Sequence, residues 1–168
     1  YTTSVKTGYR ILSGFARVNY DYNYRYMVSL VARYDGISKL SDNRWGFFPG
    51  ISAGWNVHEE AFFKDSKFAE VVSLIKPRIS YGLNGNVNGI GNFDVYGKYG
   101  SVGAYNGNLG YLNTGVVNSK LRWEKSHTFE LGLDLGFFNN RIHMIMDYYD
   151  RTTSDLLTDV NLPEYTGF

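Results

Sequence analysis

Residues 127–149 show the clearest alternation of apolar and polar positions in the chain. In residues 129–137 the odd positions are large and apolar, whereas the even positions between them hold Glu, Gly and Asp. A period of two indicates a β-strand. Asn139 and Asn140 then supply side chains that tolerate positive φ, and a second alternating run occupies residues 141–149. The whole stretch is therefore predicted to be an antiparallel β-hairpin.

The two faces of this hairpin differ in an unusual way. The polar face combines glycines with charged side chains, as expected of a wide, water-filled interior. The apolar face would then be the exterior. The alternative is a soluble sheet whose apolar face lies under a second protein layer. On the first interpretation, which we favour, the hairpin belongs to a transmembrane β-barrel, and its lumen-facing side chains are Glu130, Asp134, Arg141, His143 and Asp147.

The same alternation recurs in residues 9–20, 26–34, 45–57 and 76–85. Each of these runs reaches the length of about 9–11 residues that a membrane-spanning strand needs. Aromatic residues at both ends of a run are typical of strands that cross two headgroup regions, although Tyr is also a good strand former in any sheet. With a less regular run at residues 95–105, we expect an all-β fold of about six or seven antiparallel strands.

Two connections stand out between these strands. Residues 58–75 contain few turn residues and show some helical spacing, so we expect a connector with a short helix. Residues 86–118 are rich in Gly, Asn and Tyr and have no sustained period, which predicts a long loop of the kind that is usually functional or mobile. Strands of an up-and-down barrel are joined at alternate rims, and bacterial barrels keep one rim short. We therefore place residues 58–75 in the periplasm and residues 86–118 outside the cell.

Composition narrows the class of protein. The chain has 15 Tyr, 19 Gly and only 3 Pro, and its net charge of +1 gives no reason to expect a nucleic-acid partner. The absence of Cys excludes a disulfide framework and a thiolate metal site. The sequence contains no run of 18 apolar residues, so it does not predict a membrane-spanning helix. Because about six or seven strands cannot close a large barrel, and an open sheet edge cannot face lipid, we expect a fragment of a longer protein.

No catalytic, metal or cofactor site is predicted. Residues 58–60 (His-Glu-Glu) lack the second histidine of a zinc-binding helix, so a solvated turn is the better interpretation. His143 and Asp147 would lie about 13 Å apart along a strand and cannot form a dyad. Glu130 and Asp134 have the same spacing, and charge that lines the lumen is a better explanation than paired acid–base catalysis.

The run LRWEKSHTFELGLDLGFFNNRIHMIMDYYDRTTSDLL, residues 121–157, resembles the barrel signature of the SusC-like (SusC/RagA) family of TonB-dependent outer-membrane transporters of Bacteroidetes. Residues 45–63 and 76–86 are similar to two further family segments, in the expected order. The resemblance implies that residues 1–168 are part of a C-terminal barrel domain of about 22 strands, whose plug domain is not in this chain. It also implies a cell outer-membrane location, contact with membrane lipid, a SusD-like lipoprotein that lids the mouth, and energy supplied by the TonB complex through parts absent here.

The function that this resemblance implies is the active import of glycans (oligosaccharides) or peptides. Aromatic and Asn side chains of the long loop are candidates to hold such a substrate: Phe93, Tyr96, Tyr99, Tyr105, Asn106, Asn108 and Tyr111. An alternative is that these side chains pack the loop or contact the lipoprotein. For the whole protein, the alternative is a passive porin-like channel, or an outer-membrane adhesin or enzyme barrel, which would have no plug domain.

Overall fold

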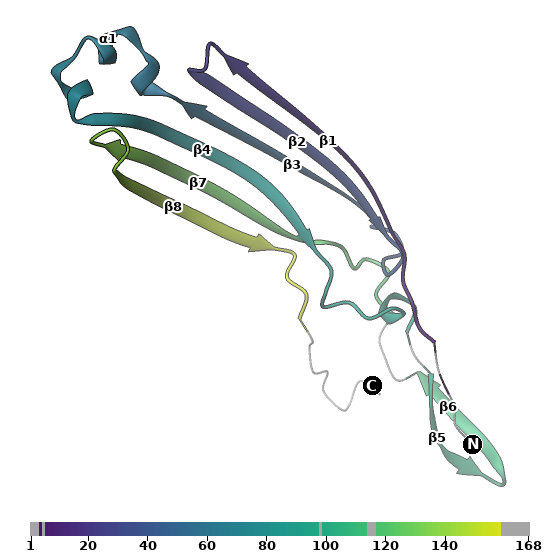
Figure 1. The fold of residues 1–168 in the computed structure, drawn as a ribbon. Helices are drawn as coiled ribbons and strands as arrows, with labels where there is room; N and C mark the ends of the chain where they lie inside the picture. Colours follow the sequence, from purple (N-terminus) through teal and green to yellow (C-terminus); the bar gives the residue numbers. More distant parts are fainter. Residues whose placement is uncertain (1–3, 5, 98, 114–116, 159–168) are drawn as a thin grey trace.

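Six long strands of the computed structural model form one antiparallel sheet in the order β1-β2-β3-β4-β7-β8 (Figure 1). The structure describes residues 4, 6–97, 99–113 and 117–158. The bounds of the six strands are β1 (Ile11–Tyr22), β2 (Tyr26–Ile37), β3 (Trp45–Trp55), β4 (Val72–Asn86), β7 (Glu124–Phe137) and β8 (Ile142–Ser154). Two further strands, β5 (Tyr99–Tyr105) and β6 (Asn108–Asn113), pair only with each other.

The predicted hairpin is confirmed. β7 and β8 pair in continuous register from Lys125–Ser154 to Phe137–Ile142. Asn139 and Asn140 have positive φ angles of 55° and 59°, as their side chains allow. Phe138 also has a positive φ, of 53°, which a bulky aromatic residue seldom adopts.

Register across the strands sorts the side chains into an apolar and a polar face. Leu30 pairs with Ile51, and Ile51 pairs with Tyr81, so one face collects apolar residues from neighbouring strands. Ile51 is 51% exposed and Leu131 is 44% exposed. In the described part of the chain no second layer of protein covers this face, and Figure 1 shows a single curved sheet. Within the described residues the apolar face of the six-stranded sheet is therefore open.

Consecutive connections lie at opposite ends of the sheet (Figure 1). One end, here called the short rim, comprises residues 23–25, 56–71 and 138–141. The other end carries residues 38–44 and 87–123, including the β5–β6 hairpin. The alternation that the strand pattern predicted is thus present, with the long connection opposite the two tight turns.

The connector on the short rim contains short helical pieces, as its spacing predicted. These are η1 (Val57–Glu59), α1 (Ala61–Lys64) and η2 (Lys67–Glu70). Its predicted end at residue 75 is wrong, because β4 already begins at Val72. The first residues of β4 pair with the C-terminal end of β7, for example Ile75 with Leu135. This pairing outweighs the local helical spacing. No helix in the described ranges is both long and apolar enough to cross a membrane.

The long connection between β4 and β7 has more structure than its composition suggests. It contains the short 3-10 helix η3 (Asp94–Tyr96) and the β5–β6 hairpin. Asn106 and Gly107, with φ angles of 49° and 80°, form the two-residue turn of that hairpin. An Asn-Gly pair between short strands is a strong hairpin signal that the aperiodic interpretation overlooked. Residues 98 and 114–116 of the predicted loop lie outside the described residues.

Candidate functional site

An ion-pair network crosses three strands on the polar face. Arg78 of β4 donates from Nε to Asp134 Oδ1 at 3.1 Å and from Nη2 to Asp147 Oδ1 at 2.7 Å. The register explains how one side chain reaches so far, because Arg78 pairs with Gly132 and Gly132 pairs with Asp147. A Cβ at position 132 would lie 2.7 Å from Asp147 Oδ1 and 2.8 Å from the guanidinium of Arg78. Glycine therefore leaves the space through which the guanidinium passes.

The surroundings of this network are polar and open to water. Ser80 Oγ donates to Glu130 at 3.5 Å, and Ser29 Oγ donates to Asn19 at 2.7 Å. These side chains line one hollow of the sheet together with Ser52, Lys76 and Arg78. The Arg78 and Asp147 side chains keep 36% and 41% of their surface exposed, so the charges remain hydrated. Such a wall suits the passage of a polar solute.

The predicted lumen-facing residues do not all lie in the same place. Glu130, Asp134 and Asp147 meet in the Arg78 network or in the hollow beside it. His143 pairs with Gly136 nearer the short rim. Arg141 precedes β8 and donates its backbone N–H to the Phe138 carbonyl at 3.3 Å, so it belongs to the turn. Their role in lining a lumen stays a prediction.

The predicted loop residues lie on two segments beyond the sheet. Phe93 precedes η3 and Tyr96 is its last residue, whereas Tyr99 and Tyr111 lie on the β5–β6 hairpin. All four side chains are exposed. Because Tyr111 pairs with Ser101, two residues beyond Tyr99, the two tyrosines share one face of the hairpin. Exposed residues Asn106 and Asn108 belong to its turn and the start of β6. The backbone of Tyr105 ends β5, but its side chain lies outside the described part of the chain.

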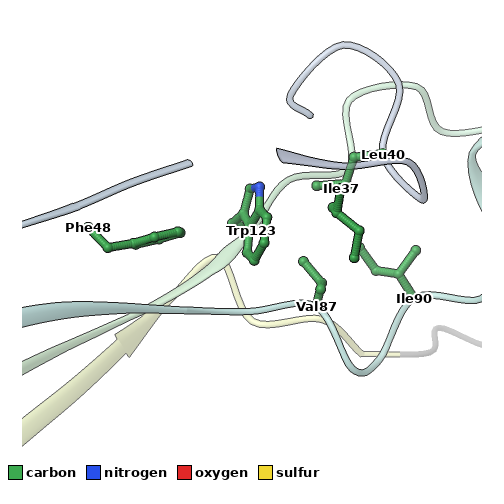
Figure 2. Close-up of a cluster of buried hydrophobic side chains, with 6 residues drawn as sticks. All are labelled: Ile37, Leu40, Phe48, Val87, Ile90 and Trp123. Atoms are coloured by element: carbon green, nitrogen blue, oxygen red, sulfur yellow. The ribbon is translucent and has the colours of Figure 1, made fainter. Parts of the chain in front are cut away.

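A buried apolar cluster at the base of these loops was not predicted. Figure 2 shows its members, which come from the end of β2, the β2–β3 connection, β3 and both ends of the long connection: Ile37, Leu40, Phe48, Val87, Ile90 and Trp123. The Phe48 and Trp123 rings pack edge to face with centroids 5.3 Å apart, and Trp123 Nε1 donates to the Arg44 carbonyl at 3.2 Å. The one sequence feature that could have indicated this cluster is Phe48, because the other residues on the same face of β3 are Gly or Ser.

Glycines make room for this cluster. A Cβ on either Gly46 or Gly85 would overlap the ring of Phe48. The Phe48 side chain therefore lies across backbone that carries no side chain of its own. In consequence, the loop base is packed as a small core and holds the root of the long connection in place.

The His-Glu-Glu segment of the connector has a structural role. Glu60 is buried, and its carboxylate accepts hydrogen bonds from Tyr26 Oη at 2.7 Å, Trp55 Nε1 at 3.2 Å and Arg25 Nη1 at 3.3 Å. The bonds from Tyr26 and then Trp55 hold the pKa of the Glu60 carboxyl below its ordinary value. The interpretation as a solvated turn is thus wrong for Glu60, because the neighbouring strand ends reach its carboxylate. No group of three or more potential metal-ligating side chains occurs among the described residues.

Comparisons with known proteins agree with this architecture. The family described as TonB dependent receptor-like, beta-barrel, matches residues 1–168. TonB-dependent receptor P39 of Formosa agariphila is 37% identical over 163 residues, which are 96% of this chain and 15% of that protein. TonB-dependent receptor SusC of Bacteroides thetaiotaomicron is 38% identical over 174 residues, which are 99% of this chain and 17% of that protein.

A solved structure of the RagAB peptide transporter is also similar. It matches with a TM-score of 0.84 at 31% sequence identity, over 95% of this chain and 17% of that chain. The chain therefore spans about a sixth of the length of the relatives that it matches. The matching family and proteins are described as TonB-dependent receptors, and the matching structure as a peptide transporter, which agrees with the prediction that the chain belongs to a receptor family and not to an enzyme family.

Sequence, strand order and relatives thus converge on one architecture. The apolar face that no protein layer covers in the described residues is the face expected of a barrel wall in lipid. The predicted fold class, an antiparallel segment of a transmembrane barrel, is confirmed by the matching family and the superposed structure. The chain belongs to the TonB dependent receptor-like β-barrel family, is SusC/RagA-like, and forms a six-stranded segment of an outer-membrane barrel.

Proposed function

We propose that this chain supplies part of the wall and a long external loop of a TonB-dependent transporter that imports glycans or peptides together with a SusD-like surface lipoprotein. The observation that carries the proposal is the exposed aromatic hairpin β5–β6, which extends beyond the end of the sheet from a packed base (Figure 1). The similarity to SusC and to the RagAB peptide transporter supports the transport of a polar nutrient and the presence of a partner.

The chemistry of the hairpin fits a polar substrate with apolar faces. Tyr99 and Tyr111 share one face, and aromatic rings there offer flat surfaces to sugar rings or to peptide side chains. Asn106 and Asn108, at the turn, offer amide donors and acceptors. The hydrated wall around Arg78 then provides a polar path below the loop. Membrane lipid surrounds the apolar face, and nucleic acid has no role.

We also propose the orientation of the barrel. The short rim, with two tight turns and the helical connector, lies in the periplasm, and residues 86–118 lie outside the cell. Bacterial barrels have short periplasmic turns and longer extracellular loops, which supports this assignment. The SusD-like lipoprotein then meets the β5–β6 side, whereas the TonB complex acts on the opposite side through parts of the protein outside this chain.

The test is a double substitution of Tyr99→Ala and Tyr111→Ala in the full-length receptor. Losing two aromatic contacts should weaken binding of a transported glycan or peptide, or of the purified lipoprotein, by about 1–3 kcal/mol, which is about five- to 150-fold. Binding is measured by calorimetry on the purified complex, with a screen of oligosaccharides and peptides as ligands. Leu112→Ala is the matched control, because Leu112 is exposed on the opposite face of β6.

Four outcomes separate the possibilities. Weaker binding with a fully assembled, heat-modifiable barrel supports the proposal. Unchanged binding of both ligand and lipoprotein refutes the role of the hairpin, and loss of assembled barrel shows that the hairpin is structural instead. Uptake that continues after TonB is inactivated refutes active transport and favours a passive channel.

A further inference from the structure

Strands β3 and β4 separate at the end of the sheet that carries the loops (Figure 1). β3 pairs with β2 along its whole length, but its pairs with β4 extend only from Gly50 with Gly82 to Gly54 with Arg78. Pro49 directly precedes the first of these pairs, and proline has no backbone N–H with which to continue a ladder. The opening between the two strands therefore begins at Pro49.

A polar pocket of about 270 Å³ lies at this opening. It is here called the loop-side pocket, and its polar lining side chains are Arg33, Asp35, Asn84, Asn86 and Asn88. Its apolar lining includes the buried rings of Phe48 and Trp123. Pockets for drug-sized ligands measure about 300–1,000 Å³, so this volume suits one smaller unit, such as a single sugar ring.

Asp35 brings a buried carboxylate with spare hydrogen-bonding capacity to the pocket. Its side chain is only 7% exposed, and Arg33 Nε lies 2.8 Å from Oδ1 and 2.7 Å from Oδ2. Among the described residues the Asp35 carboxylate has no other hydrogen-bond donor. An ionised carboxylate has about four acceptor sites, so a single N–H leaves most of them open. Burial of a charge with so few partners is costly, and a ligand that donates hydrogen bonds would lower that cost.

The other polar groups of the pocket are also available to a ligand. Only Nε of Arg33 takes part in the ion pair, and its Nη groups have no hydrogen-bond partner in the described part of the chain. Asn84 and Asn88 are exposed, and each amide offers donors and an acceptor. The charges of Arg33 and Asp35 cancel, so the lining side chains carry no net charge. This combination suits hydroxyl groups, which are uncharged and both donate and accept.

An exposed aromatic ring lies beside the pocket on the polar face. Phe15 of β1 pairs with Arg33, and Arg33 pairs with Phe48, so the three side chains share one face of neighbouring strands. Phe15 is 81% exposed, although Ser13 and Arg17 on the same face of β1 are polar. The face of an aromatic ring is electrostatically negative and attracts the slightly positive C–H groups of a sugar. Phe15 therefore offers a stacking surface next to the hydrogen-bonding groups.

We propose that the loop-side pocket is a subsite for an uncharged sugar ring, whose hydroxyl groups bind Arg33, Asp35 and Asn84 while that ring or the next unit of the glycan stacks on Phe15. Planar guanidinium, carboxylate and amide groups each present two atoms side by side, which matches two adjacent hydroxyl groups. A peptide backbone has no such hydroxyl pairs, and an acidic sugar would bring a negative charge to Asp35. The inference rests on the proposed function and narrows its substrate class to neutral glycans.

The first measurement compares ligand classes on the full-length receptor in complex with its lipoprotein. The probes are neutral oligosaccharides of glucose, xylose, mannose, galactose and arabinose, oligosaccharides that carry carboxylate or sulfate groups, and peptides of similar length. Binding is screened on an array, and the strongest neutral and charged glycans and the strongest peptide are titrated by calorimetry. A neutral glycan should bind more tightly than any charged glycan or peptide.

The second measurement places that neutral glycan in the pocket. Asn84→Ala removes an exposed amide and should weaken its binding by about 2- to 12-fold, the effect of one lost hydrogen bond. Phe15→Leu, which keeps an apolar side chain but removes the ring face, should weaken binding by about the same factor. Asp35→Asn should weaken it by about 10-fold, because hydrogen bonds to a charged group are stronger. Arg17→Gln is the control, because Arg17 is exposed on the same face but does not line the pocket.

Each variant is first checked for heat-modifiable assembly and for unchanged binding of the lipoprotein. Tighter binding of a charged glycan or a peptide overturns the subsite but leaves the proposed function in place. Unchanged glycan binding by both Asn84→Ala and Phe15→Leu also overturns the subsite, and the proposed function then stands if the Tyr99→Ala and Tyr111→Ala double variant still binds more weakly. Loss of lipoprotein binding by the pocket variants overturns the subsite as well, because the pocket would then position the loops. Binding of no probe refutes the subsite and the proposed function together.

Discussion

Replacing Leu133 by Arg tests which face of the sheet meets lipid. Leu133 lies at the middle of the apolar run of β7 and pairs with Pro77 on one side and Met146 on the other. The run from Phe129 to Phe137 spans about 27 Å along the strand, or about 20 Å along the membrane normal at a strand tilt of about 40°. Position 133 is therefore close to the bilayer midplane.

The expected magnitude follows from that depth. Arg on the lipid face at the midplane destabilises a barrel by about 2–4 kcal/mol, which corresponds to about 30- to 1,000-fold in the folding equilibrium constant. The neighbouring change Asp134→Asn affects the opposite face. It weakens a partly exposed ion pair worth at most about 1 kcal/mol, and Arg78 retains its 2.7 Å contact with Asp147. The two adjacent positions should therefore respond very differently.

The assay is guanidinium unfolding of the full-length receptor in phospholipid vesicles, followed by tryptophan fluorescence. Heat-modifiable migration on gels confirms that each variant has assembled before unfolding begins. Leu131→Arg and Leu135→Arg place the same charge at other depths and should destabilise less than Leu133→Arg. If Asp134→Asn destabilises the barrel as much as Leu133→Arg, or if Arg is tolerated at position 133, the assignment of the faces is refuted.

Two further substitutions test the loop base and the connector. Trp123→Ala should destabilise the loop-base cluster by about 3–5 kcal/mol and speed proteolysis within residues 87–123 while the barrel stays assembled, and Gly85→Ala should act in the same direction because its Cβ overlaps the Phe48 ring. Glu60 has a pKa below its ordinary value of 4.5, so it stabilises the connector fully above that value, and the stabilisation is lost as pH falls through the lower folded-state pKa. Glu60→Gln should remove this acid dependence of hydrogen exchange in residues 57–71, and an unchanged profile would show that another group is responsible.

Local patterns in the sequence determined the strands and their faces. The alternation in residues 129–137 specifies a strand and also which side chains share a face, because the side-chain period of a strand is two whatever its neighbours are. Asn139 and Asn140 specify the turn through their own tolerance of positive φ. These features depend on residues that are adjacent in the chain, so they can be predicted without the fold.

Only the tertiary structure decided which distant residues meet. Phe48 and Trp123 are far apart in the chain, and their contact depends on glycines at positions 46 and 85 that leave room for one ring. The local sequence predicts a solvated turn at Glu60, whereas the fold brings Tyr26 and Trp55 within hydrogen-bonding distance of its carboxylate. The β5–β6 hairpin pairs with itself and not with the barrel sheet, which no local periodicity states. In each case the structure depends on a contact, or on the lack of one, between segments that are distant in the chain. A local sequence pattern carries no information about the geometry that brings such segments together.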